Sequence, residues 1–191
     1  MASNQNVLVG KPVLNDAIAV APIGTALPTD VGTALNAAFK KVGYLSDDGL
    51  TEGEDRSTDT VQAWGGATVA TTQSSFEKTF QFTMIEFLNP NAQKLLRGDG
   101  NVTVTAATAS TGAKLTVRET AELPSPKAMV IDIVSGSAKV RHVIPYGQVT
   151  DSDDISWTDE DPAGLPVTFS AYPDNNGVYV YTYTDDGVFT S

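Results

Sequence analysis

The alternation of apolar and polar residues divides the chain into a short N-terminal part and a longer part with a strand-like period. Residues 17–23 (AIAVAPI) are an apolar run that ends at a glycine, which predicts a short strand. Thr29 and Asp30 then offer a helix N-cap. Apolar residues follow at helical spacing: Val31, Leu35, Phe39 and Val42. With two lysines before the closing Gly43, this pattern predicts an amphipathic helix of about three turns.

The following stretch, residues 44–66, has neither a helical nor a strand period. It is acidic, contains glycine and ends in the cluster Trp64-Gly65-Gly66. A segment of this length without regular structure in a compact domain is usually functional or disordered. We therefore expect a long loop here.

Most of the remaining chain alternates with the period of a β-strand. Phe76, Phe80, Phe82 and Met84 alternate with polar residues, which predicts a strand with one buried face. The other predicted strands are residues 102–106, 115–117, 139–144, 167–171 and 178–184. Residues 128–134 (AMVIDIV) are apolar on both faces, as in a central strand. Asn89-Pro90 is typical of a helix start and predicts a short helix that stops at Gly98.

Together these elements predict an α+β fold that is mainly β. The expected architecture is an antiparallel β-sandwich or barrel of about eight strands with one or two flanking helices. The length of 191 residues suits a single domain that spans residues 1–191. A composition with 16 Gly and 10 Pro fits strands joined by turns better than a helical bundle.

The net charge of −11 limits the possible partners. A negative surface repels DNA phosphates and argues against direct DNA binding. The acids form two clusters, in residues 47–59 and 151–161, for which solvated loops are the simplest interpretation. Residues 1–10 lack the features of a signal peptide, and no apolar run approaches the ~18 residues of a membrane span. We therefore expect synthesis in a cytoplasm and no membrane partner.

The residues that carry most enzyme chemistry are scarce. The chain has no Cys, which excludes disulfides and thiolate metal sites. Its single histidine, His142, shares a strand face with Val140 and Ile144, which favours a packed or interface imidazole over a catalytic base. Residues 151–154 (DSDD) lack the glycine and glutamate of a calcium loop. We predict no catalytic residue, no metal and no cofactor.

A tyrosine stripe leaves a binding function open. Tyr179, Tyr181 and Tyr183 are expected on one face of a strand, where such a stripe could stack sugars or bases. Core or subunit-interface packing is the more common role. The alternative function is therefore a β-sandwich module that binds carbohydrate or a cell surface.

An ordered series of motifs resembles one protein family. Residues 22–30 (PIGTALPTD) are followed by residues 43–50 (GYLSDDGL), then by Arg56-Ser57-Thr58 and residues 63–66 (AWGG). In this order they resemble the first third of the major tail tube proteins of siphophages, especially those that infect actinobacteria. The strand before Asn89-Pro90 and the VTFSAY motif at residues 167–172 extend the resemblance over nearly the whole chain. Some relatives carry an additional immunoglobulin-like domain, for which this chain has no length.

The resemblance implies a structural role. In this family, six copies form a ring whose inner strands line a channel. The rings stack around a tape-measure protein and meet tail-end proteins, and DNA later passes through the lumen without specific binding. The protein would then belong to the virion tail after assembly in the host bacterial cytoplasm. No catalytic residue is implied.

Within this role, two sets of residues are candidates for function. We expect residues 44–66 to form an acidic arm that orders only on contact with a neighbouring subunit. Its contact residues would be Tyr44, Asp47, Asp48, Arg56 and Trp64. The alternative is an ordinary loop whose Trp64 packs on its own domain. Acids that could face the lumen are Glu77, Glu119 and Asp132.

Overall fold

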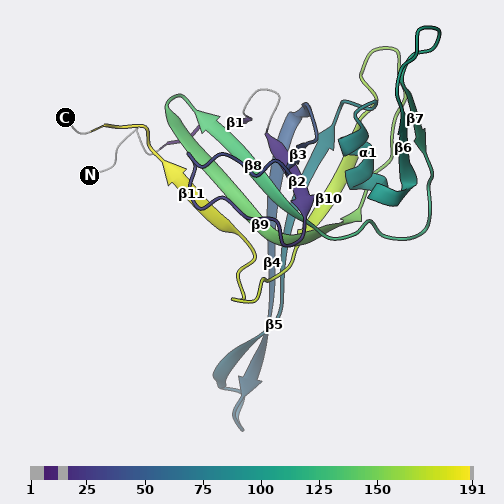
Figure 1. Ribbon diagram of the computed structural model, residues 1–191. Helices are drawn as coiled ribbons and strands as arrows, with labels where there is room; N and C mark the ends of the chain where they lie inside the picture. The colour runs from purple at the N-terminus through teal and green to yellow at the C-terminus, as the bar shows by residue number, and fades with distance from the viewer. Residues whose placement is uncertain (1–6, 13–16, 190–191) are drawn as a thin grey trace.

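A curved antiparallel sheet organises the chain (Figure 1). The computed structural model describes residues 7–12 and 17–189. Within these residues, the large sheet has nine strands, in the order β3-β2-β8-β9-β10-β5-β4, with β1 paired to β8 and β11 paired to β9. The strands are β1 (Lys11–Pro12), β2 (Ile18–Pro22), β3 (Lys40–Lys41), β4 (Leu45–Gln62), β5 (Thr68–Met84), β8 (Lys127–Ser135), β9 (Ala138–Asp151), β10 (Leu165–Ala171) and β11 (Tyr181–Asp185).

A smaller unit lies beside the large sheet. The helix α1 (Pro90–Arg97) and the 3-10 turn η2 (Asp99–Asn101) lead into a two-stranded sheet of β6 (Val102–Thr105) and β7 (Lys114–Val117). Figure 1 shows this sheet beyond α1, away from the chain termini. The predicted mainly β, antiparallel α+β class is therefore confirmed, with one α-helix in the described part of the chain.

Two apolar clusters use the opposite faces of the central strands. Ile131 and Ile144 belong to the larger cluster, together with Phe80, Phe169 and Leu95 of α1. The alternate residues, Val130 and Val143 among them, belong to a smaller cluster. This arrangement confirms the prediction that residues 128–134 form a central strand, with both faces buried over residues 128–131 and half-buried over residues 132–134.

The short helix was predicted correctly from its cap. Asn89 Oδ1 accepts a hydrogen bond of 2.9 Å from the N–H of Asn91, and Pro90 occupies the first turn. Leu95 and Leu96 lie on the buried face of the helix. The final strand was predicted three residues too early, since β11 begins at Tyr181. Residues 1–6, part of the segment judged not to be a signal peptide, lie outside the described residues.

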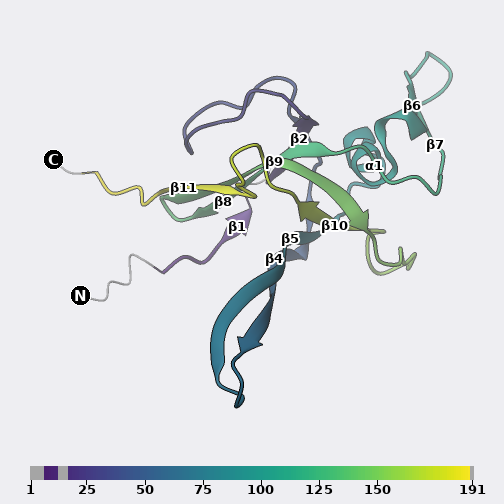
Figure 2. The same cartoon turned by 90° about the horizontal axis from the view of Figure 1, so that it is seen from below.

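The predicted helix over residues 31–42 is wrong. This segment is irregular and ends in the short strand β3. Its apolar residues do point inward: Leu35 and Phe39 pack on the smaller cluster and Val42 on the larger one. Figure 2 shows the segment passing over one side of the sheet. Its backbone carbonyls bond to a side chain of β9 rather than to a following helical turn, as described below.

The expectation of a loop over residues 44–66 is also wrong. Residues 45–62 are the strand β4, which pairs with β5 from Leu50↔Phe82 to Gln62↔Thr68. The alternation of apolar and polar residues did not predict this strand, because every residue from 54 to 75 is exposed. Hydrophobic alternation detects a strand through its buried face, and here both faces are in water.

Candidate assembly surface

The hairpin of β4 and β5 extends well beyond the rest of the molecule (Figures 1 and 2). Near its base, Leu50 packs against the larger cluster, and Phe80 and Phe82 are buried. Beyond Gly53 and Phe76, which are half-buried, all residues of both strands are exposed. The outer hairpin, residues 54–75, therefore adds nothing to the core of its own subunit.

Charged and aromatic side chains stiffen the base of this hairpin. Lys78 Nζ lies 2.5 Å from Glu52 Oε1 and 3.8 Å from Glu54 Oε2. The guanidinium of Arg56 lies 3.1 Å from Glu54 Oε1 and 4.9 Å from the centre of the Phe76 ring. The cross-strand contacts hold the two strands in register, although each exposed pair adds little stability.

The hairpin tip presents a tryptophan to solvent. The N–H of Gly66 donates to the carbonyl of Ala63 at 2.9 Å, and Gly65 and Gly66 have φ values of 104° and 87°. These left-handed conformations suit glycine. Trp64 is fully exposed, so in the free chain it does not pack on its own domain. A large aromatic side chain in this position is unusual for a surface without a partner.

The other predicted arm residues lie at or near the hairpin base. The N–H of Tyr44 donates to Glu86 Oε1 at 3.0 Å, which ties this residue to its own subunit. Asp47 and Asp48 follow, and they line an open cavity of about 520 Å³ together with acids of the second cluster: Asp153, Asp154 and Asp161. The fold thus brings together two acidic clusters that lie far apart in the sequence. The described residues contain no group of three or more His, Asp or Glu arranged to hold a metal ion.

The three candidate lumen acids lie on different parts of the molecule. Glu77 is exposed on β5, directly across from Asp55 of β4. Glu119 Oε1 lies 3.0 Å from Arg97 Nη2 and remains largely exposed. Asp132 is half-buried on β8 and pairs with Arg141. The structure does not gather them into one site, and it leaves Glu77 and Glu119 as the more accessible charges.

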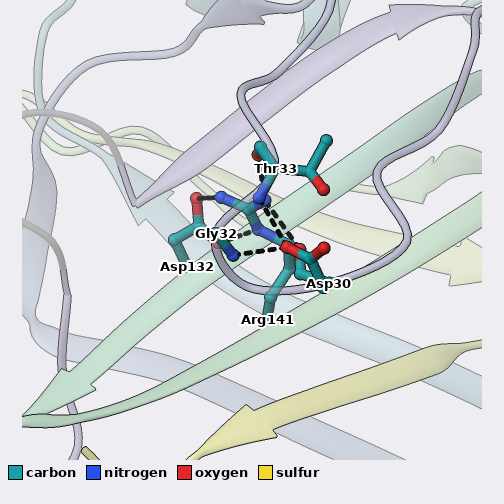
Figure 3. Close-up of polar contacts among 5 residues, drawn as sticks. All are labelled: Asp30, Gly32, Thr33, Asp132 and Arg141. Atoms are coloured by element: carbon teal, nitrogen blue, oxygen red, sulfur yellow. Dashed lines mark hydrogen bonds and ion pairs between the residues drawn. The ribbon is translucent and has the colours of Figure 1, made fainter.

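Arg141 connects the sheet to the irregular segment that covers it (Figure 3). Its Nε and Nη2 atoms donate to the two carboxylate oxygens of Asp132 at 2.6 and 2.9 Å. Its Nη1 atom donates to the carbonyl oxygens of Asp30 at 3.0 Å and Thr33 at 2.6 Å. The guanidinium therefore binds two carbonyls that would accept backbone hydrogen bonds if the segment were a helix.

The side chain of Asp30 stabilises the same segment by bonding to its backbone N–H groups. Its Oδ1 atom accepts hydrogen bonds from the N–H groups of Gly32 at 2.6 Å and Thr33 at 2.5 Å. The bonds from the Thr33 side chain and backbone, and then from Gly32, lower the pKa of the Asp30 carboxyl. An aspartate that bonds its own following backbone forms a turn and competes with helix. One signal for this pair is present in the sequence: a turn at residues 136–137 places Asp132 opposite Arg141 on the neighbouring strand.

His142 is half-buried on β9. Its Nδ1 atom lies 2.9 Å from the hydroxyl of Thr182, and its ring centre lies 6.4 Å from that of Phe80. Burial lowers its pKa. These contacts are those of a structural imidazole.

The tyrosines do not form the single platform that their spacing suggested. Tyr179 precedes β11 and packs edge-on against Phe76 at 4.8 Å, next to the larger cluster. Tyr181 and Tyr183 pack on the smaller cluster, and the Tyr181 hydroxyl donates to Asp174 Oδ2 at 2.8 Å. The prediction of one common face therefore holds for Tyr181 and Tyr183 but is wrong for Tyr179. None of the contacts of these three described residues favours the carbohydrate-binding alternative.

Within the part of the chain that the structure covers, no helix has the length and apolar character needed to cross a membrane. A family model described as "Phage tail tube protein" matches residues 1–189. A search among curated proteins gave no match.

Proposed function

Because this chain belongs to the phage tail tube protein family, we propose that it polymerises as stacked hexameric rings that form the tube of a long, non-contractile siphophage tail. The chain acts as one tail tube domain, residues 1–191, without catalytic activity or cofactor. It assembles in the bacterial cytoplasm around a tape-measure protein, contacts tail-end proteins and remains in the virion tail.

The exposed outer hairpin is the observation that carries this proposal. A two-stranded hairpin alone in water is marginally stable at best. Residues 54–75 nevertheless form a regular ladder without a core of their own. Contact with other copies would bury this ladder, so the hairpin is the inter-subunit arm. Arg56 stiffens the arm, and Trp64 is its terminal contact.

An open sheet edge supplies a second route to self-association. One end of the large sheet is the long strand β4. An edge strand presents unpaired backbone N–H and C=O groups that another chain can bond. Pairing of such edges around a ring would close the sheets of all copies into a continuous wall.

The charge suits a conduit for DNA. Each copy carries a net charge of −11, and a ring multiplies this charge. An acidic wall repels phosphates, so DNA passes through the lumen without being held. Glu77 and Glu119 are the accessible lumen candidates, whereas Arg141 offsets the charge of Asp132.

Electron microscopy of the concentrated wild-type protein tests the proposal. We expect tubes or stacked rings in negative stain, with sixfold symmetry in end-on class averages. Featureless monomers at every concentration would contradict self-assembly. Rings of another symmetry would contradict the hexamer but not the tube.

A further inference from the structure

A small apolar cavity lies near the base of the hairpin, on the body of the molecule. Its volume is about 220 Å³, and it lies between β1, β4 and β8. Leu45, Leu50, Ile131 and Ile133 supply most of its apolar lining. Two groups able to accept a hydrogen bond, the Glu52 carboxylate and the His142 imidazole, also line it. The cavity thus combines apolar walls with a polar acceptor.

The residue whose chemistry fits this cavity is Trp64. An indole gains free energy when its ring leaves water, and its N–H needs an acceptor when it is buried. Trp64 is fully exposed at the hairpin tip. Trp64 is fourteen positions from Leu50 along the extended hairpin, which corresponds to at most about 46 Å at roughly 3.3 Å per residue. The side chain therefore cannot reach the cavity of its own subunit.

We propose that Trp64 of one copy inserts into the cavity lined by Leu50, Ile131 and Ile133 of a second copy. This inference rests on the proposed tube function and adds the receptor site for the arm. The occupant is a second copy because the group that fits the cavity, an exposed indole at the tip of a long arm, belongs to this chain itself.

The distribution of charge along the hairpin supports this contact. Two copies with a net charge of −11 each repel one another as they approach. Residues 60–76 contain no charged side chain, whereas the acids lie closer to the base. The uncharged tip is thus the part of the arm that can enter another acidic subunit without like-charge repulsion.

The geometry of the contact also suits a polymer. Donor and receptor lie on different surfaces, so each copy can give one contact and receive one. Where two copies do not exchange the contact reciprocally, such heterologous contacts generate closed rings or open stacks. The arm length limits the distance from Leu50 of the donor to the receptor cavity to about 46 Å.

Tryptophan fluorescence tests the burial of the indole. Replacement of Trp157 by Phe leaves Trp64 as the single tryptophan and retains an aromatic ring beside Phe87. We expect Trp64 in the monomer to emit as a water-exposed indole and to be quenched by iodide. On assembly, the emission should shift to shorter wavelength and the quenching should be lost.

Engineered cysteines test the identity of the receptor. The chain has no Cys, so every disulfide formed is the designed one. In the double variant Ala63→Cys/Leu50→Cys, oxidation of tubes should give a ladder of covalent oligomers, because bridged cysteines need Cα atoms within about 7 Å. The matched control Ala63→Cys/Thr105→Cys places the second thiol on exposed β6 and should give no ladder.

The outcomes separate this inference from the proposed function. A blue shift together with a ladder specific to Leu50→Cys supports docking in the cavity. Normal tubes that lack either signal, or that give equal ladders with the control, overturn the docking and leave the tube function standing. Failure of the wild-type protein to form rings or tubes overturns both.

Discussion

Arg141 on β9 and Asp132 on β8 face each other across the central strands, and two hydrogen bonds of 2.6 and 2.9 Å join the guanidinium to the carboxylate. Arg141 is only 7% exposed, and its third nitrogen holds the carbonyls of Asp30 and Thr33. The pair therefore determines both the local sheet contacts and the path of the segment above it.

Replacement of Arg141 by Ala should destabilise the subunit by about 3–5 kcal/mol, because it leaves a partly buried carboxylate without its partner. Urea unfolding measures this change, and hydrogen exchange should show faster exchange in residues 30–39. Lys139→Ala, at an exposed position of the same strand, is the control, with an expected change within about 0.5 kcal/mol. A loss below about 1 kcal/mol for Arg141→Ala would contradict the anchoring role.

His142 should make stability depend on pH. Burial lowers its pKa below the ordinary 6.5. As the pH falls through this value, the unfolded chain binds a proton before the folded chain does, so the free energy of unfolding decreases. Urea titrations between about pH 8 and pH 5 should show this slope in the wild type and a smaller slope in His142→Gln. Identical slopes would refute the contribution of His142.

The same His142→Gln variant also tests for hidden chemistry. Glutamine has a reach similar to that of the imidazole and keeps a hydrogen-bond acceptor at the cavity that His142 lines, so tubes should form nearly as in the wild type. Electron microscopy checks this expectation. Detection of a hydrolytic activity that disappears with this substitution would overturn the purely structural role.

Reversal of charge at the lumen should affect DNA passage rather than assembly. Glu77→Lys and Glu119→Lys are the first variants to test, provided that a map of the tube shows these side chains facing inward. We expect tubes to form and DNA ejection to slow, because cationic groups on the wall attract phosphates. Ejection at the wild-type rate from tubes with inward lysines would contradict the electrostatic account.

The outer hairpin should change its dynamics on assembly. Its ladder in the free subunit is exposed on both faces, so amide hydrogens of residues 54–75 should exchange quickly in the monomer. In the tube they should become protected, whereas Phe80 and Phe82 near the base should be protected in both states. Equal exchange of the outer hairpin in monomer and tube would show that the arm makes no contact.

The sequence predicted those strands that bury one face in their own subunit. Phe80 and Phe82 alternate with polar residues because β5 packs on a core at that end. The outer half of the same strand has no buried face in the free chain, and so carries no alternation to detect. If its partner is another subunit, as we propose, the missing signal follows from the assembly itself.

The helix prediction for residues 31–42 was wrong for a different reason. The spacing of Leu35, Phe39 and Val42 correctly indicated which side chains face inward. The backbone conformation depends on Arg141, more than 100 positions away, which bonds the carbonyls of the segment. Asp47 and Asp153 line the same cavity because of the order of the strands in the sheet. Local sequence patterns do not contain this order.

Shortening of the hairpin tests the central claim most directly. Thr60 and Thr71 are paired across the ladder, so replacing the residues between them with a tight turn preserves the register of the base. We predict that the shortened subunit unfolds at the wild-type denaturant concentration, yet remains monomeric in electron micrographs under conditions where the wild type forms tubes. Normal tubes from the shortened subunit would contradict the account.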